Sequence, residues 1–363
     1  MNLFNNIYNG KRVLVTGHTG FKGSWLTLWL NLLGAKVCGF SNNERTTPSL
    51  FHILKLKKKI KDNVGDISNF ENISKSIKKF QPEIIFHLAA QSLVKESYLK
   101  PIKTFKTNSL GTLNLLKASE QSKKLKAIVL ITSDKVYKNI EIQRGYKEND
   151  LIMGNDPYSA SKSCAEVIAN MYINSFLSKK VQICITRAGN VIGGGDWSKD
   201  RIIPDLFKTW SKNKSLNIRN PNSTRPWQFV LEPLGAYLYL GSLLLKKDKN
   251  INLKSFNVGP RQNVDKTVKE LMYAIQKIIP NLKYKEIKDK NNKEAKLLRL
   301  NCKKIYKYTK WQPIYSFSQT VDNTIKWYIK YTDKKKDINQ FSIEQIKNYI
   351  KFARLNKIKW IRE

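Results

Sequence analysis

Histidine and cysteine are scarce in this chain of 363 residues, which has three histidines and four cysteines. The cysteines are scattered and form no CxxC pair, and His18, His52 and His87 are far apart in the sequence. We therefore expect no metal site and no disulfide framework. Reduced thiols of this kind are typical of a cytoplasmic protein.

Long apolar runs are absent as well. No stretch of about 18 apolar residues occurs, so no membrane span is predicted. The start of the chain, MNLFNNIYNGKRVLV, lacks the apolar segment and small-residue cleavage site of a secretory signal. Apolar residues still make up 41% of the chain, enough for a sizeable core in one large domain or two smaller ones.

Acidic residues are also scarce. The chain has 28 Asp and Glu against 66 Lys and Arg, which gives a net charge of +38. Such a charge is compatible with nucleic-acid binding, but the lysines are spread along the whole chain and no recognition motif accompanies them. We therefore expect a solvated, lysine-rich surface and no nucleic-acid partner. A milder interpretation is a positive field that attracts an anionic substrate.

Apolar strands and helical segments alternate through the first half of the chain. This alternation predicts an α/β fold built on a doubly wound parallel sheet of the Rossmann type. From about residue 190 the alternation weakens and prolines become frequent. We therefore predict a dinucleotide-binding domain over residues 1–190. A smaller mixed domain for the substrate follows over 191–363, with some chain crossing between the two.

The predicted elements have definite places in the sequence. The strands are expected at residues 12–17, 36–41, 60–68, 83–90, 126–133 and 181–193. The helices are expected at residues 23–34, 73–80, 104–122 and 158–176, with a terminal helix over 342–363.

The segment TGHTGFKG joins the first predicted strand to the first predicted helix. Its glycines, Gly17, Gly20 and Gly23, allow a tight turn, a close approach of backbone to a pyrophosphate, and close packing of helix on strand. The helix N-terminus then offers N–H groups to the phosphates. The spacing GxxGxxG is the variant found in short-chain dehydrogenases. An unliganded glycine-rich turn is the alternative interpretation.

The residues after the second predicted strand leave the choice between NAD and NADP open. An acid that binds the ribose 2′-hydroxyl normally stands there, whereas the segment SNNERTT offers Glu44 with Arg45 beside it. Asp66 lies at the end of the third predicted strand and is expected near the adenine. His87 lies within an apolar strand and is interpreted as structural.

Tyr158 and Lys162 stand four residues apart at the start of a predicted helix, so they share one face. A lysine ammonium group there lowers the pKa of the phenol, and the tyrosine then serves as a general base toward a substrate hydroxyl. The segment TSDKVY adds Ser133, Asp134 and Lys135 at the end of the fifth predicted strand. For Asp134 and Lys135 the alternative is a helix N-cap followed by a solvated lysine.

Several segments resemble those of extended short-chain dehydrogenases, and specifically the family of CDP-glucose 4,6-dehydratases. The resemblance runs from about residue 10 to residue 330. The segments are VLVTGHTGFKGSW, HLAAQSLVKESY, ITSDKVY, DPYSASKSCAE, RAGNVIGGGDW, DRIIPD and IRNPNSTRPWQFVLEPLGAYL.

The resemblance implies a hydro-lyase that binds NAD tightly and converts CDP-D-glucose to CDP-4-dehydro-6-deoxy-D-glucose. Tyr158 would take the proton of the 4-hydroxyl while Ser133 holds the 4-oxygen. Asp134 would be the acid for the departing 6-hydroxyl, which requires it to be protonated. Lys135 stands where relatives that act on dTDP-glucose carry Glu. It would act as a neutral base at C5 or stay charged and stabilise the enolate.

The same resemblance implies the binding residues and a homodimer or homotetramer. The residues expected to bind NAD are Gly17, Thr19, Gly20, Phe21, Gly23, Asp66, Ile67, Leu88, Ala89, Ala90, Asn108, Thr132, Tyr158 and Lys162. The residues expected to bind the nucleotide sugar are Asn190, Arg201, Arg219 and Arg225, among which Arg201, like Arg187, is alternatively part of a structural ion pair. Trp197 and Trp227 are expected against sugar or base, or in the core.

Two other functions are alternatives to the dehydratase. The first is an NAD-dependent epimerase or reductase on nucleotide sugars with the same fold. Enzymes of that kind lack the Asp134–Lys135 pair. The second is a nicotinamide-binding regulatory or RNA-binding protein that uses the positive charge, against which the intact spacing of Tyr158 and Lys162 argues.

Overall fold

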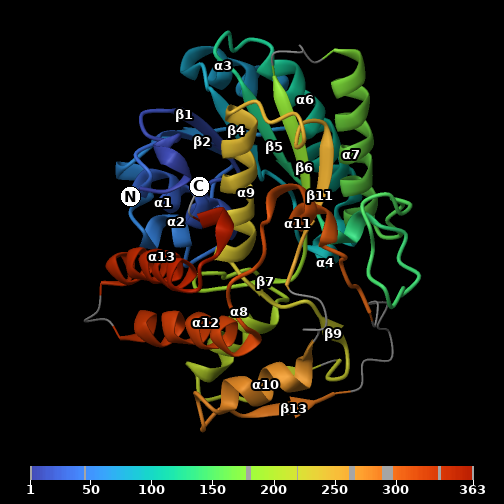
Figure 1. The fold of residues 1–363 in the computed structure, drawn as a ribbon. Coiled ribbons are helices and arrows are strands. Elements are labelled where there is room, and N and C mark those ends of the chain that lie inside the picture. Colours follow the sequence, from blue (N-terminus) through green and yellow to red (C-terminus); the bar gives the residue numbers. More distant parts are fainter. Residues whose placement is uncertain are drawn as a thin grey trace.

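A seven-stranded parallel sheet forms the centre of the protein (Figure 1). The computed structural model describes residues 2–44, 46–176, 181–218, 220–260, 266–287, 297–333 and 337–361. The strand order is β11-β6-β5-β4-β1-β2-β3, and every adjacent pair is parallel. The order reverses direction at β1, as in a doubly wound Rossmann sheet. The predicted fold class is thereby confirmed.

The six strands predicted from the sequence all form. They are β1 (Arg12–Thr16), β2 (Lys36–Ser41), β3 (Lys61–Val64), β4 (Ile84–His87), β5 (Ala127–Ile131) and β6 (Gln182–Ala188). The seventh, β11 (Lys254–Val258), was not predicted and pairs with β6, although it lies far beyond residue 190 in the sequence.

The sheet buries both of its faces, because alternate residues of each strand point to opposite sides. In β1, Val13 and Val15 join one apolar cluster and Leu14 joins the other, and all three are fully buried. Helices α3 (Phe70–Phe80), α6 (Gly111–Ser119) and α7 (Pro157–Ser175) cover one face. Helices α1 (Phe21–Leu32) and α9 (Leu231–Leu245) cover the other, where α9 packs on β5 and β6.

The helix predicted over residues 104–122 is built from three pieces. Helix α5 (Pro101–Phe105) runs into a π-helical turn, η3 (Lys106–Leu110), and then into α6. The π turn inserts one extra residue per turn, which shifts the faces of the helices on either side of it. Asn108 is the third residue of this turn and is fully buried.

The predicted terminal helix is shorter than expected and starts earlier. Helix α13 (Ile338–Leu355) ends before Lys357, whose positive φ of 53° cannot continue a right-handed helix. The last described residues form a 3₁₀ turn, η5 (Lys359–Ile361), which buries Trp360 against the core.

A smaller layer of helices and short strands adjoins the sheet, with α8, α10, α12 and β13 toward the bottom of the view in Figure 1. Its helices are α8 (Ile202–Trp210), α10 (Val268–Gln276), α11 (Lys303–Thr309) and α12 (Phe317–Thr332). Its strands are β7 (Val191–Ile192), β8 (Leu216–Ile218), β9 (Thr224–Arg225), β10 (Gln228–Phe229), β12 (Lys266–Thr267) and β13 (Tyr284–Glu286). The remaining short elements are α2 (Leu50–Ile53), α4 (Val94–Leu99), η1 (Phe4–Asn6), η2 (Leu56–Lys58) and η4 (Asp134–Val136).

His87 is buried at the end of β4 between two threonines. Its Nδ1 lies 2.8 Å from Thr16 Oγ1 and its Nε2 lies 3.2 Å from Thr112 Oγ1. Burial, and then the charge of Lys162, lower the pKa of His87 from 6.5 to about 3. The neutral ring is therefore part of the folded core, as the structural interpretation of this residue required.

Acidification is expected to weaken the fold through His87. Between pH 6.5 and 3 the unfolded chain binds a proton that the folded protein excludes, so stability is present at neutral pH and is lost as the pH falls below 6.5. From pH 7 to pH 5 this residue accounts for about 2 kcal/mol. Urea unfolding at both pH values measures the loss. His87→Gln should show a smaller pH dependence by that amount, and an identical dependence would contradict the assignment.

None of the described helices is long enough and apolar enough to span a membrane. The four cysteines are all free.

Candidate active site

A cleft lies at the carboxyl ends of the central strands, where ligands bind in open α/β sheets. Its walls come from the turn after β1, the ends of β2, β4 and β5, the start of α7 and the loop before α8. Because these segments are far apart in the sequence, the sheet is what brings them to one place.

The turn from β1 into α1 has no room for side chains at two of its glycines. Gly17 has a φ of 74°, and a Cβ there would lie 2.8 Å from the backbone nitrogen of Ala89. A Cβ on Gly23 would lie 2.1 Å from the carbonyl oxygen of Gly17. The turn therefore presents bare backbone and the N-terminus of α1 to the cleft, which is a geometry suited to a pyrophosphate.

Most of the residues predicted to bind the cofactor line this cleft. They are Gly17, Thr19, Gly20, Phe21, Gly23, Ile67, Leu88, Ala89, Ala90, Thr132, Tyr158 and Lys162. Asp66 and Asn108 do not. Asp66 accepts hydrogen bonds from the backbone and side chain of Ser68, at 2.9 and 2.8 Å.

Both the oxygen and the nitrogen of the Asn108 side-chain amide form hydrogen bonds within the protein. Its Oδ1 accepts from the Gln91 backbone at 2.8 Å, and its Nδ2 donates to the Gln91 carbonyl at 3.0 Å and to Ser161 Oγ at 2.8 Å. These bonds tie the loop after β4 to helix α7. In the described structure Asn108 thus positions the helix that carries Tyr158.

Tyr158 and Lys162 are both buried in the cleft wall on the first turns of α7. Burial raises the pKa of Tyr158 to about 12. Asp134 adds to the rise, while Ser133 and Arg201 oppose it. Burial and the nearby charge of Lys22 lower the pKa of Lys162 to about 7, against the opposing effect of Glu166. The Lys162 ammonium group donates to the carbonyl of Ile131 at 3.4 Å.

The TSDKVY segment forms a single 3₁₀ turn at the end of β5. Ser133 caps the turn by accepting from the Lys135 backbone at 3.2 Å, and its hydroxyl donates to Asp134 Oδ1 at 3.0 Å. Asp134 is 1% exposed, and its Oδ2 has no hydrogen-bond partner. The cap is therefore Ser133, and Asp134 is a buried carboxyl with one free oxygen. Lys135 is half-buried and does not line the cleft.

Space for the Asp134 carboxyl depends on Gly189, at the end of β6. A Cβ on Gly189 would lie 1.7 Å from Asp134 Oδ2. A glycine at this position is thus what allows the carboxyl to occupy its place beside Tyr158.

The sequence reasoning missed Lys22, the residue between Phe21 and Gly23. It lines the cleft together with Lys162 and Arg201. Burial, then Arg201, lower the pKa of Lys22 to about 8, and Asp134 opposes this effect. A lysine inside a glycine-rich phosphate-binding turn was visible in the sequence, but its partners come from distant segments.

The residues predicted to bind the substrate differ in their placement. Arg201 lines the cleft and pairs with Asp196 at 2.9 Å, so it is both an ion-pair member and a cleft residue. Asn190 has a φ of 40° and follows β6, outside the cleft lining. Arg225 lies in β9, where it donates to the Thr224 carbonyl at 2.8 Å. Arg219 lies outside the described residues, as does Arg45.

Arg187 is a structural residue. Its guanidinium group binds both oxygens of Glu166, with Nη2 to Oε2 at 2.6 Å, and donates to the Tyr137 hydroxyl at 2.7 Å. Burial acts to lower the pKa of Arg187, but the Glu166 carboxylate outweighs it and the pKa is raised. Of the two arginines for which an ion pair was the alternative, only Arg201 also reaches the cleft.

The two tryptophans in the predicted substrate segments are both largely buried. Trp197 lines the cleft and packs edge-on against Tyr328, at a centroid distance of 5.2 Å. Trp227 donates its Nε1 to the Lys266 carbonyl at 3.0 Å and lies outside the cleft lining. Trp197 is thus the one available to a ligand.

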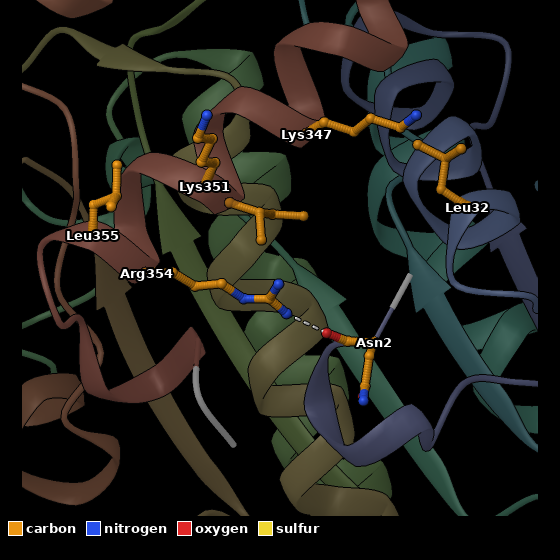
Figure 2. Close-up of a pocket in the computed structure, with 7 residues that line it drawn as sticks. Asn2, Leu32, Lys347, Lys351, Arg354 and Leu355 are labelled. Carbon is orange, nitrogen blue, oxygen red and sulfur yellow. Dashed lines mark hydrogen bonds between the residues drawn. The ribbon is translucent and has the colours of Figure 1, made fainter.

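A second hollow lies between α1 and α13, away from this chemistry. Figure 2 shows it bordered by Asn2, Leu32, Lys347, Lys351 and Arg354. It contains no acid, hydroxyl or aromatic group that could act on a substrate. Among the described residues, no group of three or more His, Cys, Asp or Glu side chains is placed to hold a metal ion.

The fold, the glycine-rich turn and the Tyr158–Lys162 pair together define an extended short-chain dehydrogenase. A family model described as GDP-mannose 4,6 dehydratase matches residues 14–324. The chain belongs to this family.

Relatives of known activity agree with that assignment. The chain is 43% identical to the CDP-glucose 4,6-dehydratase of Salmonella typhimurium over 89% of this chain and 92% of that one. It is 27% identical to the dTDP-glucose 4,6-dehydratase of Haemophilus influenzae over 74% of this chain and 82% of that one. The resemblance inferred from the sequence segments is confirmed.

Solved structures share the fold at lower identity. An epimerase from Methanothermobacter thermautotrophicus superposes with a TM-score of 0.78 at 24% identity, covering 90% of this chain and 95% of the other. The dTDP-glucose 4,6-dehydratase of Bacillus anthracis, solved in complex with NAD, superposes with a TM-score of 0.75 at 23% identity. That match covers 90% of this chain and 98% of the other.

Proposed function

We propose that this protein is a hydro-lyase that converts CDP-D-glucose and releases water to give CDP-4-dehydro-6-deoxy-D-glucose. The observation that carries the proposal is the turn of Ser133, Asp134 and Lys135, in which the Asp134 carboxyl is buried beside Tyr158. A nucleotide-sugar epimerase needs a base and a cofactor, but it has no use for an acid directed at a departing hydroxyl. The identity to the Salmonella enzyme supports CDP-glucose as the substrate.

NAD fits the cleft on structural grounds. The backbone around Gly17 and Gly23 is packed too closely for a side chain, so the turn offers bare backbone and the N-terminus of α1 to a pyrophosphate. Ser41, Asn42 and Thr46 line the far end of the cleft, where the ribose of the adenosine half would lie. NAD bound there would supply the hydride acceptor for oxidation at C4 of the sugar and the hydride donor for reduction at C6.

Tyr158 is the base in this proposal, and Lys162 makes that possible. Burial is the largest cause that raises the pKa of the phenol to about 12, which is too high for a base at neutral pH. A charged Lys162 on the same helix face favours the phenolate, and Ser133 adds a hydrogen bond to the 4-oxygen. Tyr158 then takes the 4-hydroxyl proton as the ketone forms.

Asp134 delivers a proton to the 6-hydroxyl as water leaves. The 4-ketone acidifies the C5 hydrogen, so elimination across C5 and C6 needs an acid on one side and a base or a charge on the other. The free Oδ2 of Asp134, buried beside Tyr158, is the oxygen available for the acid role. Lys135 follows on the same turn and serves C5 or the enolate oxygen.

Lys135→Arg separates the two roles proposed for that amine. A guanidinium group keeps its charge at every accessible pH and cannot act as a neutral base. If Lys135 stabilises the enolate by charge, the variant should retain most of its turnover. If Lys135 is the base at C5, turnover should fall about 100-fold or more. Exchange of the C5 hydrogen with deuterated water, followed by mass spectrometry, identifies the affected step.

The test of the function is a substrate panel. The purified protein is incubated with CDP-, dTDP-, UDP- and GDP-hexoses, and mass spectrometry follows the loss of one water. We expect loss of water from CDP-glucose. Inversion at C4 without a change of mass would identify an epimerase and overturn the proposal.

The proposal extends to assembly and location. Exposed apolar side chains gather on α4, α5 and α7, among them Leu99, Ile102, Val167 and Phe176. Pairing of these helices between copies would give the homodimer or homotetramer that the sequence suggested.

The cytoplasm is the compartment we expect, because four free cysteines suit reducing conditions.

A further inference from the structure

The end of β2 reaches the cleft beside the glycine-rich turn. Ser41 is the last residue of β2, and its Oγ lies 2.8 Å from Thr19 Oγ1 in that turn. Asn42 follows directly, and both Ser41 and Asn42 line the cleft. In sheets of this type an acid at the end of the second strand binds the 2′-hydroxyl of the adenosine ribose and thereby favours NAD over NADP. Here a hydroxyl and an amide stand at that place.

The acidic residues around the ends of β2 and β3 stand outside the cleft lining. They are Glu44, Asp62 and Asp66. The Glu44 side chain is exposed. Asp62, on β3, is bonded through Oδ1 to Nε2 of the buried His18 at 2.8 Å, and Asp66 accepts two hydrogen bonds from Ser68. The described residues therefore offer no carboxylate to the 2′-hydroxyl.

The lining of the cleft carries more positive than negative charge. Among the described residues its one acid is Asp196, which pairs with Arg201 at 2.9 Å. Lys22 and Lys162 add two further cationic side chains. A cleft lined by one sign of charge raises the local concentration of ligands of the opposite sign. A dinucleotide with one more phosphate is therefore attracted to this cleft and meets no carboxylate where its ribose would lie.

We propose that Asn42 determines which dinucleotide the cleft accepts, and that its uncharged amide lets the protein bind NADP as well as NAD. The inference rests on the proposed function, because it concerns the cofactor site of that enzyme. An amide can donate to a phosphate oxygen and accept from a ribose hydroxyl, whereas a carboxylate can only accept. Because like charges placed side by side are costly, a carboxylate at this position would exclude the 2′-phosphate.

The test lets the two dinucleotides compete for the same protein. The full-length chain is dialysed against equal concentrations of NAD and NADP, both in excess over the protein, and native mass spectrometry measures how much of each is bound. The wild type should carry both, in amounts within about tenfold of each other, because only hydrogen bonds to uncharged groups differ between them at this position. A wild type that carries only one of the two, or neither, would overturn the proposal.

Asn42→Asp and Asn43→Asp form a matched pair of variants. Both make the same change of shape and charge at adjacent positions, but Asn43 is exposed and does not line the cleft. In Asn42→Asp the bound NADP should fall about 100-fold or more relative to NAD, because the new carboxylate repels the 2′-phosphate. In Asn43→Asp the ratio should stay close to that of the wild type. An unchanged ratio in Asn42→Asp, or the same shift in both variants, would contradict the role of Asn42.

Asn42→Arg makes the opposite change. A guanidinium group binds phosphate through two parallel hydrogen bonds, so the bound ratio should move toward NADP by about tenfold or more. A shift toward NAD, or no shift, would count against the proposal. None of these measurements needs turnover. If the wild type fails to dehydrate CDP-glucose, the proposed function fails, while the bound ratios still decide the role of Asn42.

Discussion

Asp134→Asn is expected to lower the rate of water loss from CDP-glucose by about two to four orders of magnitude, the usual contribution of a general acid. An asparagine has the same shape but carries no proton that it could give to the leaving hydroxyl. Ser133 can still donate to the remaining Oδ1 position, so the turn should keep its geometry. Mass spectrometry of the sugar product measures the rate, and the 4-keto sugar that retains its 6-hydroxyl should appear at no more than one equivalent per bound NAD.

Binding of NAD should survive this substitution. The glycine-rich turn lies on a different segment of the chain. The turn lines the cleft, whereas Asp134 does not. Titration calorimetry with NAD provides that control, and Asp200→Asn, at an exposed ion pair with Lys95, provides a matched change of charge. Unchanged turnover in Asp134→Asn would exclude the acid role.

Gly189→Ala tests the acid role of Asp134 by displacing its carboxyl group while leaving the carboxyl in the protein. The new methyl group would lie 1.7 Å from Asp134 Oδ2, so the carboxyl must rotate away. The acid is then present but misplaced, and dehydration should fall as it does in Asp134→Asn. Loss of activity in both variants, with NAD binding retained in both, points to the position of the carboxyl as well as its proton.

The sheet was predictable because its strands are apolar runs that end in turn residues. Helix α9 and strand β11 escaped prediction for a physical reason. All but one of the residues of α9 are buried, including Glu232 and Tyr237, so it has no polar face and no helical period to detect. Strand β11 is only five residues long, and its first two residues, Lys254 and Ser255, are polar and half-buried, so its sequence resembles a loop.

The active site was predictable as a set of residue types but not as a set of charges. The spacing of Tyr158 and Lys162 fixes their shared face, and the glycine spacing fixes the turn. The pKa of Lys162 is lowered first by burial and then by Lys22, which is 140 positions earlier in the sequence, and the fold creates both effects. Likewise, only the fold distinguishes Arg187, which is paired inside the protein, from Arg201, which reaches the cleft.

Glu166→Ala is expected to cost about 3 to 5 kcal/mol of unfolding free energy, because it leaves the guanidinium group of Arg187 buried without its counter-charge. Both residues are almost completely buried, and Thr132 Oγ1 also donates to Glu166 at 2.5 Å. These bonds join α7 to the ends of β5 and β6. Urea unfolding measures the loss, and Asp150→Ala, at the half-exposed pair with Arg144, should cost much less.

The double variant Glu166→Leu with Arg187→Met distinguishes two causes of this loss of stability. One is the buried charge that Arg187 keeps without its partner, and the other is the loss of the attraction between the two side chains. If the cost of Glu166→Ala comes from an uncompensated buried charge, then replacing both members with apolar side chains should recover a large part of the stability. A double variant as unstable as the single one would show that the pair contributes through its attraction. The same experiment reports on function. Helix α7 carries Tyr158 and Lys162, so a recovered fold without recovered turnover would assign Glu166 to the placement of those two residues.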